Sequence, residues 1–239
     1  MINKLQTIGL FDSGIGGLGI ARKIRKLLPN ENLVYLADSK NCPYGTKPIS
    51  QIQNICAENV ETLINKYHSK MIVIACNTAT VSAIDYLRRK YKTVPIVGVV
   101  PVIKTAVGKT KTGKITVMST PNTIKSQAYK NLLKKFASGV EVISISCPGL
   151  AEAIEHKLPK KEINAIVRNF LKPFGETGYD VLALGCTHYT LIKQDIKKIV
   201  GENVEVIDSN GAVARHVKRV LAKEKLLATS KGRGEIHII

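Results

Sequence analysis

The chain alternates short apolar runs with longer segments whose apolar residues recur at helical spacing. In residues 49–64, for example, apolar side chains return every three or four positions, which predicts an amphipathic helix on a core. Runs typical of buried strands fall at residues 5–11, 32–37, 71–75, 95–99, 115–118, 140–145, 179–184 and 204–207, with a last strand expected at 235–239. Strands separated by helices form right-handed βαβ units. The pattern therefore predicts the α/β class, with mostly parallel sheets flanked by helices.

The sequence also contains an internal echo. Residues 8–13 resemble residues 116–121, which aligns Asp12 with Thr120, and each segment is followed at a nearly equal distance by a strand-end cysteine. A Gly/Lys/Thr-rich stretch at 108–114 marks a change of composition, so we expect a domain crossing near residue 100. Parallel sheets bind ligands at the carboxyl ends of their strands. We therefore expect two similar domains, with the active site in the cleft between them.

The two strand-end cysteines, Cys76 and Cys186, are followed directly by hydrogen-bonding side chains, Asn77-Thr78 and Thr187-His188. Free cysteines are commonly buried and inert. A helix that begins just after a cysteine, however, favours its thiolate through the macrodipole and the unpaired N–H groups. His188 titrates near neutrality and can set the protonation state of the thiol beside it. The pattern therefore favours two reactive thiols.

Two of the other three cysteines have a simpler interpretation. Cys56 lies on the apolar face of the 49–64 helix, and Cys147 precedes Pro148 without a polar neighbour, so both are expected to be structural. Five cysteines at wide spacing argue against a disulfide framework, and no C-x-x-C pattern indicates zinc. A metal site built from Cys76, Cys186 and His188 would lack carboxylates at ligand spacing. No metal and no other cofactor are expected.

A glycine-rich turn, Gly14–Gly19, follows the first strand and precedes a helix. It satisfies the G-x-G-x-x-G pattern, and Asp38 ends the second strand, as in a dinucleotide fingerprint. Asp12 places a carboxylate just before the turn, where it would repel a pyrophosphate. The N–H groups of the turn therefore suit a smaller anion, such as a substrate carboxylate, better. A nucleotide-binding protein that uses this turn is the alternative function from another class.

The amino-acid composition limits which classes of partner the protein is expected to bind. The 239 residues are 44% hydrophobic and 23% charged, which indicates a globular chain. No apolar run approaches the roughly 18 residues of a membrane span, and no secretory segment is recognisable, so we expect a cytoplasmic protein without a membrane partner. The net charge of +18 would suit nucleic acid, but the cations are mostly lysines spread over helices, with no Trp and only four Phe for base stacking. Specific nucleic-acid binding is not expected.

Two thiols on opposite sides of a ligand can invert a carbon stereocentre. One thiolate removes a proton while the opposite thiol delivers another, and the thiol pKa of about 8.5 can be lowered toward the operating pH. Inward-pointing N–H dipoles and hydroxyls would support the carbanion. With Asp12 tuning one thiol and His188 the other, this design requires neither metal nor pyridoxal.

Five motifs occur in the order seen in one known family. They are Asp12-Ser13-Gly14, Pro43-Tyr44-Gly45, the Ala-Cys-Asn-Thr-Ala run at 75–79, Thr120 with Thr123, and the Gly-Cys-Thr-His run at 185–188. Together they resemble cofactor-independent glutamate racemase over residues 9–217. The resemblance implies conversion of L-glutamate to D-glutamate for peptidoglycan synthesis, and hence a role in cell wall biogenesis and cell shape. It also implies two α/β domains, comprising residues 1–99 plus 207–239 and residues 100–206.

The resemblance further implies roles for individual residues. Cys76 would take the proton from D-glutamate with help from Asp12, and Cys186 would take it from L-glutamate with help from His188. Glu155 matches the acidic residue that supports the second thiol, and Glu152 is its competitor for that role. The matching substrate-binding positions are Asp12, Ser13, Tyr44, Gly45, Asn77, Thr78, Thr120, Thr123, Thr187 and His188.

The expected partner is thus a small-molecule substrate, glutamate. A racemase for aspartate or another acidic amino acid is the nearest alternative, because the sequence does not fix the depth of a pocket. The oligomeric state is left open, a homodimer included. Three departures from the family stand out. The segment around Glu155 is less apolar than is usual in the family. Ser119 occupies a position where the family often has glycine, and the C-terminal residues 233–239 lack the typical ending.

Overall fold

The computed structural model describes residues 6–99, 102–229 and 232–239. They divide into two compact units: unit 1 holds 6–99, 210–229 and 232–239, and unit 2 holds 102–209. The domain crossing expected near residue 100 lies outside the described residues. The chain returns to unit 1 after Ser209, beyond a strand that ends at Ile207. No helix in the described ranges is long and apolar enough to cross a membrane.

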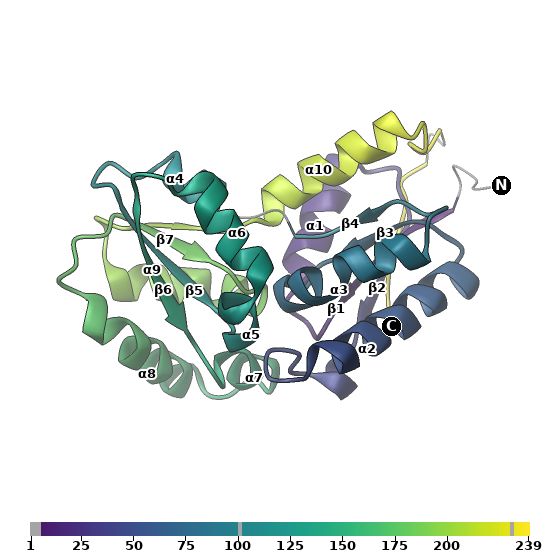
Figure 1. The fold of residues 1–239 in the computed structure, drawn as a ribbon. Helices are drawn as coiled ribbons and strands as arrows, with labels where there is room; N and C mark the ends of the chain where they lie inside the picture. The colour runs from purple at the N-terminus through teal and green to yellow at the C-terminus, as the bar shows by residue number, and fades with distance from the viewer. Residues whose placement is uncertain (1–5, 100–101, 230–231) are drawn as a thin grey trace. The chain divides into compact units, whose positions relative to one another are not determined.

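Unit 1 is a five-stranded sheet with helices on both faces (Figure 1). The strand order is β4-β3-β1-β2-β9, and each neighbouring pair is parallel. The strands are β1 (Thr7–Asp12), β2 (Leu33–Ala37), β3 (Ser69–Ile74), β4 (Ile96–Val97) and β9 (Ile236–Ile238). The helices are α1 (Leu18–Leu27), the 3₁₀ helix η1 (Ser39–Asn41), α2 (Ile49–Asn65), α3 (Asn77–Lys90) and α10 (Asn210–Lys223).

Successive side chains of the central strands point to opposite faces of this sheet, and each face is buried in its own hydrophobic core. In β3, Met71 and Val73 pack with α1 and α10, whereas Ile72 and Ile74 pack with α2 and α3. Strands that are covered on both faces read as continuous apolar runs, which is why the sequence pattern located them.

Unit 2 is a four-stranded parallel sheet in the order β6-β5-β7-β8. Its strands are β5 (Lys114–Ser119), β6 (Glu141–Ser146), β7 (Val181–Leu184) and β8 (Glu205–Ile207). One face is covered by α4 (Val102–Val107) and α6 (Gln127–Phe136), and the other by α7 (Leu150–Glu155), α8 (Lys160–Leu171) and α9 (Lys193–Val200). Three short helices complete the unit: α5 (Pro121–Lys125) and the 3₁₀ helices η2 (Lys172–Phe174) and η3 (His188–Ile192).

The two sheets share one topology. Replacing β1, β2, β3 and β4 by β5, β6, β7 and β8 converts the first strand order into the second, and β9 is an additional edge strand of unit 1. The prediction of two similar α/β domains with parallel sheets is therefore confirmed.

The internal echo, however, was aligned one residue out of register. The Ala75 N–H donates to the Phe11 carbonyl at 2.8 Å, and the Gly185 N–H donates to the Met118 carbonyl at 2.8 Å. Phe11 therefore corresponds to Met118, and Asp12 corresponds to Ser119 and not to Thr120. When every residue of a strand is apolar, side-chain type does not show which residue of one half corresponds to which residue of the other. The backbone hydrogen bonds do show this correspondence.

Candidate active site

In unit 1, three neighbouring strands end at the same edge of the sheet. The Asp38 N–H donates to the Asp12 carbonyl at 2.9 Å, beyond the ends of β1 and β2. Ala75 bonds to Phe11 in the same way beyond β3, so that Cys76 follows directly. Parallel pairing thus gathers Asp12, Asp38 and Cys76 at the carboxyl edge, where α/β sheets place their ligands.

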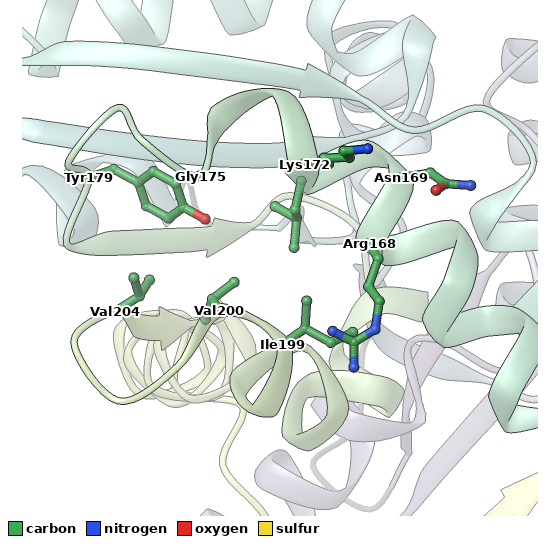
Figure 2. A pocket seen from close by; sticks show the side chains of 9 residues that line it. Arg168, Asn169, Lys172, Gly175, Tyr179, Ile199, Val200 and Val204 are labelled. Atoms are coloured by element: carbon green, nitrogen blue, oxygen red, sulfur yellow. The ribbon is translucent and has the colours of Figure 1, made fainter.

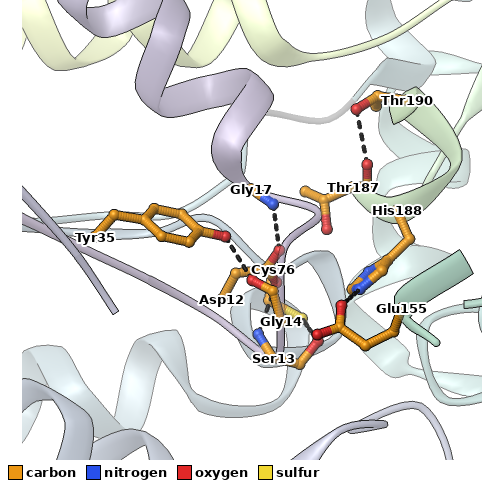
Figure 3. A network of polar contacts seen from close by, with 10 residues as sticks. All are labelled: Asp12, Ser13, Gly14, Gly17, Tyr35, Cys76, Glu155, Thr187, His188 and Thr190. Carbon is orange, nitrogen blue, oxygen red and sulfur yellow. Dashed lines mark hydrogen bonds and ion pairs between the residues drawn. The ribbon is translucent and has the colours of Figure 1, made fainter. Parts of the chain in front are cut away.

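The Asp12 carboxylate organises the glycine-rich turn. It is fully buried and accepts hydrogen bonds from the N–H groups of Ser13, at 2.8 Å, and Gly17 (Figure 3). A Cβ on Gly17 would lie 2.7 Å from the Cβ of Ala75, so the turn packs against the next strand end only with glycine there. These two N–H groups therefore bind the Asp12 carboxylate and are not available to bind a pyrophosphate.

Cys76 caps the first turn of α3. The Ala79 N–H donates to its Sγ at 3.5 Å, and the Ser13 hydroxyl lies 3.8 Å from the same sulfur. The thiol is only 5% exposed. Because α3 is a full α-helix that begins at the next residue, its N-terminus favours negative charge on this sulfur. The prediction of a helix directly after Cys76 is confirmed.

The loop that carries Tyr44 and Gly45 is held by a buried polar cluster. The Tyr44 hydroxyl donates to the Asp38 carboxylate, and the Asn59 amide donates to both groups, at 3.1 Å and 3.3 Å. Burial is the main reason why the pKa of Tyr44 lies well above its usual range, so the phenol stays a hydrogen-bond donor. Asp38, which the fingerprint would direct at a ribose, is engaged within the protein.

Asn59 is a residue that the sequence analysis missed. It is buried on α2, on the same apolar face as Cys56 and Leu63. The sequence did contain a signal for it, namely an amide in the middle of the apolar face of a helix. Such a buried polar side chain is normally hydrogen-bonded to another polar group. Cys56 itself is fully buried in the core, and burial raises its pKa well above the usual range, as expected of a structural thiol.

In unit 2, Cys186 follows the end of β7 and is 6% exposed. The preceding Gly185 is tightly enclosed: a Cβ there would lie 3.0 Å from both the Cβ and the Oγ of Ser119. The Ser119 hydroxyl also donates to the Gly185 carbonyl at 2.7 Å. Ser119, noted as a departure from the family, thus braces the strand end that carries Cys186.

The segment after Cys186 differs from the prediction. It is the five-residue 3₁₀ helix η3, and the α-helix α9 begins only at Lys193. A short 3₁₀ helix has few aligned peptide dipoles. The macrodipole argument made for both cysteines therefore holds for Cys76 and is wrong for Cys186, so the two strand ends are not chemically equivalent.

His188 and Glu155 form a buried pair. The His188 Nε2 lies 2.7 Å from the Glu155 Oε2, with the two side chains 2% and 6% exposed (Figure 3). Glu155 is the last residue of α7, whereas Glu152 lies one turn earlier on that helix. The carboxylate that contacts His188 is thus the one that the family resemblance indicates, and the contact fixes the orientation of the imidazole ring.

Further hydroxyls and thiols complete the unit 2 strand ends. The Thr120 and Thr123 hydroxyls lie 3.0 Å apart at the start of α5, and both residues are buried, as is Thr187. Cys147 is 1% exposed, and burial is the main cause that raises its pKa to about 12. That environment agrees with the structural role expected for Cys147.

In unit 1, Gly45 and Thr78 are buried and Asn77 is half-buried.

Comparison with known proteins identifies the family. The sequence profile described as Asp/Glu/Hydantoin racemase matches residues 18–217. A curated glutamate racemase from Clostridium botulinum is 38% identical over 240 residues, covering 100% of this chain and 93% of its own length. A glutamate racemase from Bacillus anthracis matches in structure with a TM-score of 0.87 at 34% identity, over 99% of this chain and 89% of that chain.

A second solved structure, glutamate racemase from Francisella tularensis in complex with D-glutamate, matches with a TM-score of 0.85 at 33% identity. The match covers 98% of this chain and 88% of that one. Profile, sequence and fold agree over nearly the whole chain. The chain therefore belongs to the Asp/Glu/Hydantoin racemase family of isomerases.

Proposed function

We propose that this protein is a glutamate racemase, which interconverts L- and D-glutamate by cofactor-independent proton transfer between two thiols and Cα. The observation that carries the proposal is the placement of Cys76 and Cys186. In a chain of this family, they occupy equivalent strand ends of two sheets that share one topology.

The chemistry balances without an external reagent. One cysteine, as thiolate, accepts the Cα proton and becomes a thiol, while the electron pair stays on the substrate as a carbanion delocalised into the carboxylate. The other cysteine, as thiol, delivers its proton to the opposite face and becomes a thiolate. The product is the other enantiomer, and the protonation states of the two cysteines are exchanged. The reverse reaction uses the same groups in the opposite order.

On the side of unit 1, we assign removal of the proton from D-glutamate to Cys76. The N-terminus of α3 supports the thiolate, and the Asp12 carboxylate, held by two backbone N–H groups, assists. Ser13 contributes a hydroxyl 3.8 Å from the sulfur. The remaining substrate contacts proposed for this unit come from Tyr44, Gly45, Asn77 and Thr78.

On the side of unit 2, we assign removal of the proton from L-glutamate to Cys186. Without an α-helix N-terminus behind it, this thiol depends more on His188, whose ring is oriented by Glu155. We therefore take Glu155 as a positioning residue for His188. The hydroxyls of Thr120, Thr123 and Thr187 are the proposed substrate contacts of this unit.

The product D-glutamate would be used for bacterial peptidoglycan and would link the protein to cell wall biogenesis and cell shape. This role rests on the family to which the chain belongs, as does the choice of glutamate over aspartate. The relatives described above carry the name glutamate racemase.

Chiral chromatography after incubation with L-glutamate, without added cofactor, tests the reaction. D-glutamate should accumulate to near half of the total, because two enantiomers have equal free energy in solution. A parallel assay with L-aspartate should give a much lower kcat/KM. Absence of D-glutamate would refute the proposal, and a higher kcat/KM for aspartate would identify the alternative racemase. A thermal shift with NAD or ATP but none with glutamate would favour the nucleotide-binding alternative.

A further inference from the structure

Unit 2 contains a cavity of about 460 Å³ that the proposed reaction does not use (Figure 2). It lies between the ends of α8 and α9 and the segments that precede β7 and β8. Tyr179 precedes β7 at the cavity, whereas Cys186 follows the opposite end of that strand. The cavity is therefore separate from the strand-end residues of unit 2, and its size is that of small-molecule sites, which span about 300–1,000 Å³.

The wall of the cavity combines apolar and polar groups. Ile199 and Val200 from the last turn of α9, Val204 before β8 and the ring of Tyr179 form the apolar part. Figure 2 shows the Tyr179 hydroxyl directed toward Val200, and the Arg168 side chain extending beside Ile199. A ligand with a flat apolar body would thus contact apolar side chains on two sides of the cavity. The same wall also contains a phenol and a guanidinium group.

The polar side chains of this wall have no partners of their own. Among the residues that the structure describes, Arg168, Asn169, Lys172 and Tyr179 make no side-chain hydrogen bond and no ion pair. Arg168 and Lys172 lie one helical turn apart, and Figure 2 shows the Lys172 and Asn169 side chains pointing away from Tyr179 and Val200. Burial raises the pKa of Tyr179 above its usual value, so its hydroxyl is a proton donor at neutral pH.

The charge of the cavity favours an anion. No carboxylate occurs among the described residues that line it, whereas Arg168 and Lys172 bring two positive charges. The C-terminal ends of α8 and α9 oppose them with about half a negative charge each. Two full charges exceed that sum of roughly one, so the cavity remains net positive.

A neighbouring cavity of unit 2 provides a contrast. It is also rich in lysine, but two of its lysines are paired with carboxylates: Lys109 pairs with Glu205 at 2.5 Å and Lys193 pairs with Asp208 at 2.7 Å. Asp180 there accepts hydrogen bonds from the backbone of Lys111 and from nearby threonines. The lack of such internal pairing singles out the cavity at Arg168.

We propose that this cavity binds a small organic anion with a flat apolar body. The acidic group, a carboxylate, sulfonate or phosphate, is held by the Arg168 guanidinium, and Lys172 adds a second positive charge. The apolar body packs on Tyr179, Ile199, Val200 and Val204. Planar guanidinium groups suit these acidic groups because they bind two oxygens at once.

A pair of fluorescent probes tests the proposal on the full chain. 8-Anilinonaphthalene-1-sulfonate carries the acid, and N-phenyl-1-naphthylamine is its neutral counterpart. We expect one sulfonate per chain, and Arg168→Gln should weaken its binding about tenfold, as loss of a charged hydrogen bond does. Binding of the neutral probe should change less than twofold. Val200→Phe, which fills the cavity, should abolish binding of both probes.

The matched control is Lys198→Gln, which removes one positive charge from an exposed position of α9 outside the cavity wall. It should leave both affinities unchanged, and saturating L-glutamate should not displace the sulfonate. Circular dichroism verifies that each variant is folded. Equal sulfonate binding by wild type and Arg168→Gln, equal losses in Arg168→Gln and Lys198→Gln, or displacement by L-glutamate would overturn the proposal.

Discussion

Lys70 is a cation without access to solvent, and its replacement gives a sharp test of how unit 1 is held together. Its Nζ lies 2.7 Å from the Glu31 Oε2, with the two side chains 0% and 3% exposed. The second oxygen of Glu31 accepts the Ala228 N–H at 2.8 Å. The pair therefore joins β3, the loop before β2 and the C-terminal segment that leads to β9. We predict that Lys70→Met destabilises unit 1 and loosens that segment.

The size of the effect follows from burial. Methionine fills a similar volume but leaves the Glu31 carboxylate buried without its cation, and breaking a buried pair in this way costs about 3–5 kcal/mol. For a domain of roughly 150–250 residues, 1 kcal/mol lowers Tm by about 2–4 °C, so the expected drop is roughly 6–20 °C. Adding Glu31→Gln removes the stranded charge and keeps an acceptor for Ala228. The double variant should therefore recover at least half of the loss.

Calorimetry measures the Tm, and hydrogen exchange at the Ala228 amide reports the local effect. Lys90→Met is the matched control in the same unit, because it breaks the pair with Glu61, whose two side chains are 42% and 47% exposed. Exposed pairs contribute little, so this variant should keep the Tm of the wild type. A Lys70→Met variant with an unchanged Tm, or a double variant less stable than the single one, would show that the buried pair does not hold unit 1 together in this way.

Two more predictions concern the strand ends of unit 2. Gly185→Ala should lower kcat at least tenfold, because the new Cβ meets Ser119 at 3.0 Å and displaces Cys186, and adding Ser119→Gly should restore part of the activity; equal activity of Gly185→Ala and wild type would contradict this. Cys147, with its pKa raised to about 12, should be alkylated at pH 8 roughly a thousandfold more slowly than an ordinary thiol, and faster as the pH rises. Mass spectrometry of the iodoacetamide-treated native protein measures that rate, and labelling of Cys147 at an ordinary rate would show that burial does not protect it.

The sequence located the main features of the fold because the central strands are covered on both faces. Apolar runs such as those of β3 and β7, separated by helical segments, are typical of strands in the middle of an α/β sheet, and Cys76 and Cys186 follow directly after their carboxyl ends. The shared topology of the two units was likewise visible as an echo, although its register was not.

Other features depend on tertiary packing that no local pattern records. The predicted strand at residues 71–75 did not include Lys70, although Lys70 belongs to β3. A charged residue is almost never fully buried unless it is paired, and its partner Glu31 lies far away in the sequence. Glu152 and Glu155 stand on the same short helix, and only the packing of α7 against η3 decides which of them reaches His188. The 3₁₀ form of η3 was also hidden, because helical spacing does not distinguish it from an α-helix over five residues.

We propose that Cys76 and Cys186 act as the two bases on glutamate. The most direct measurement follows deuterium incorporation at Cα in D₂O for wild type, Cys76→Ala and Cys186→Ala, with L- and D-glutamate as separate substrates. We expect wild type to form the opposite enantiomer carrying deuterium at Cα, and neither variant to form the opposite enantiomer from either substrate. Racemisation at a substantial rate by either variant would contradict it.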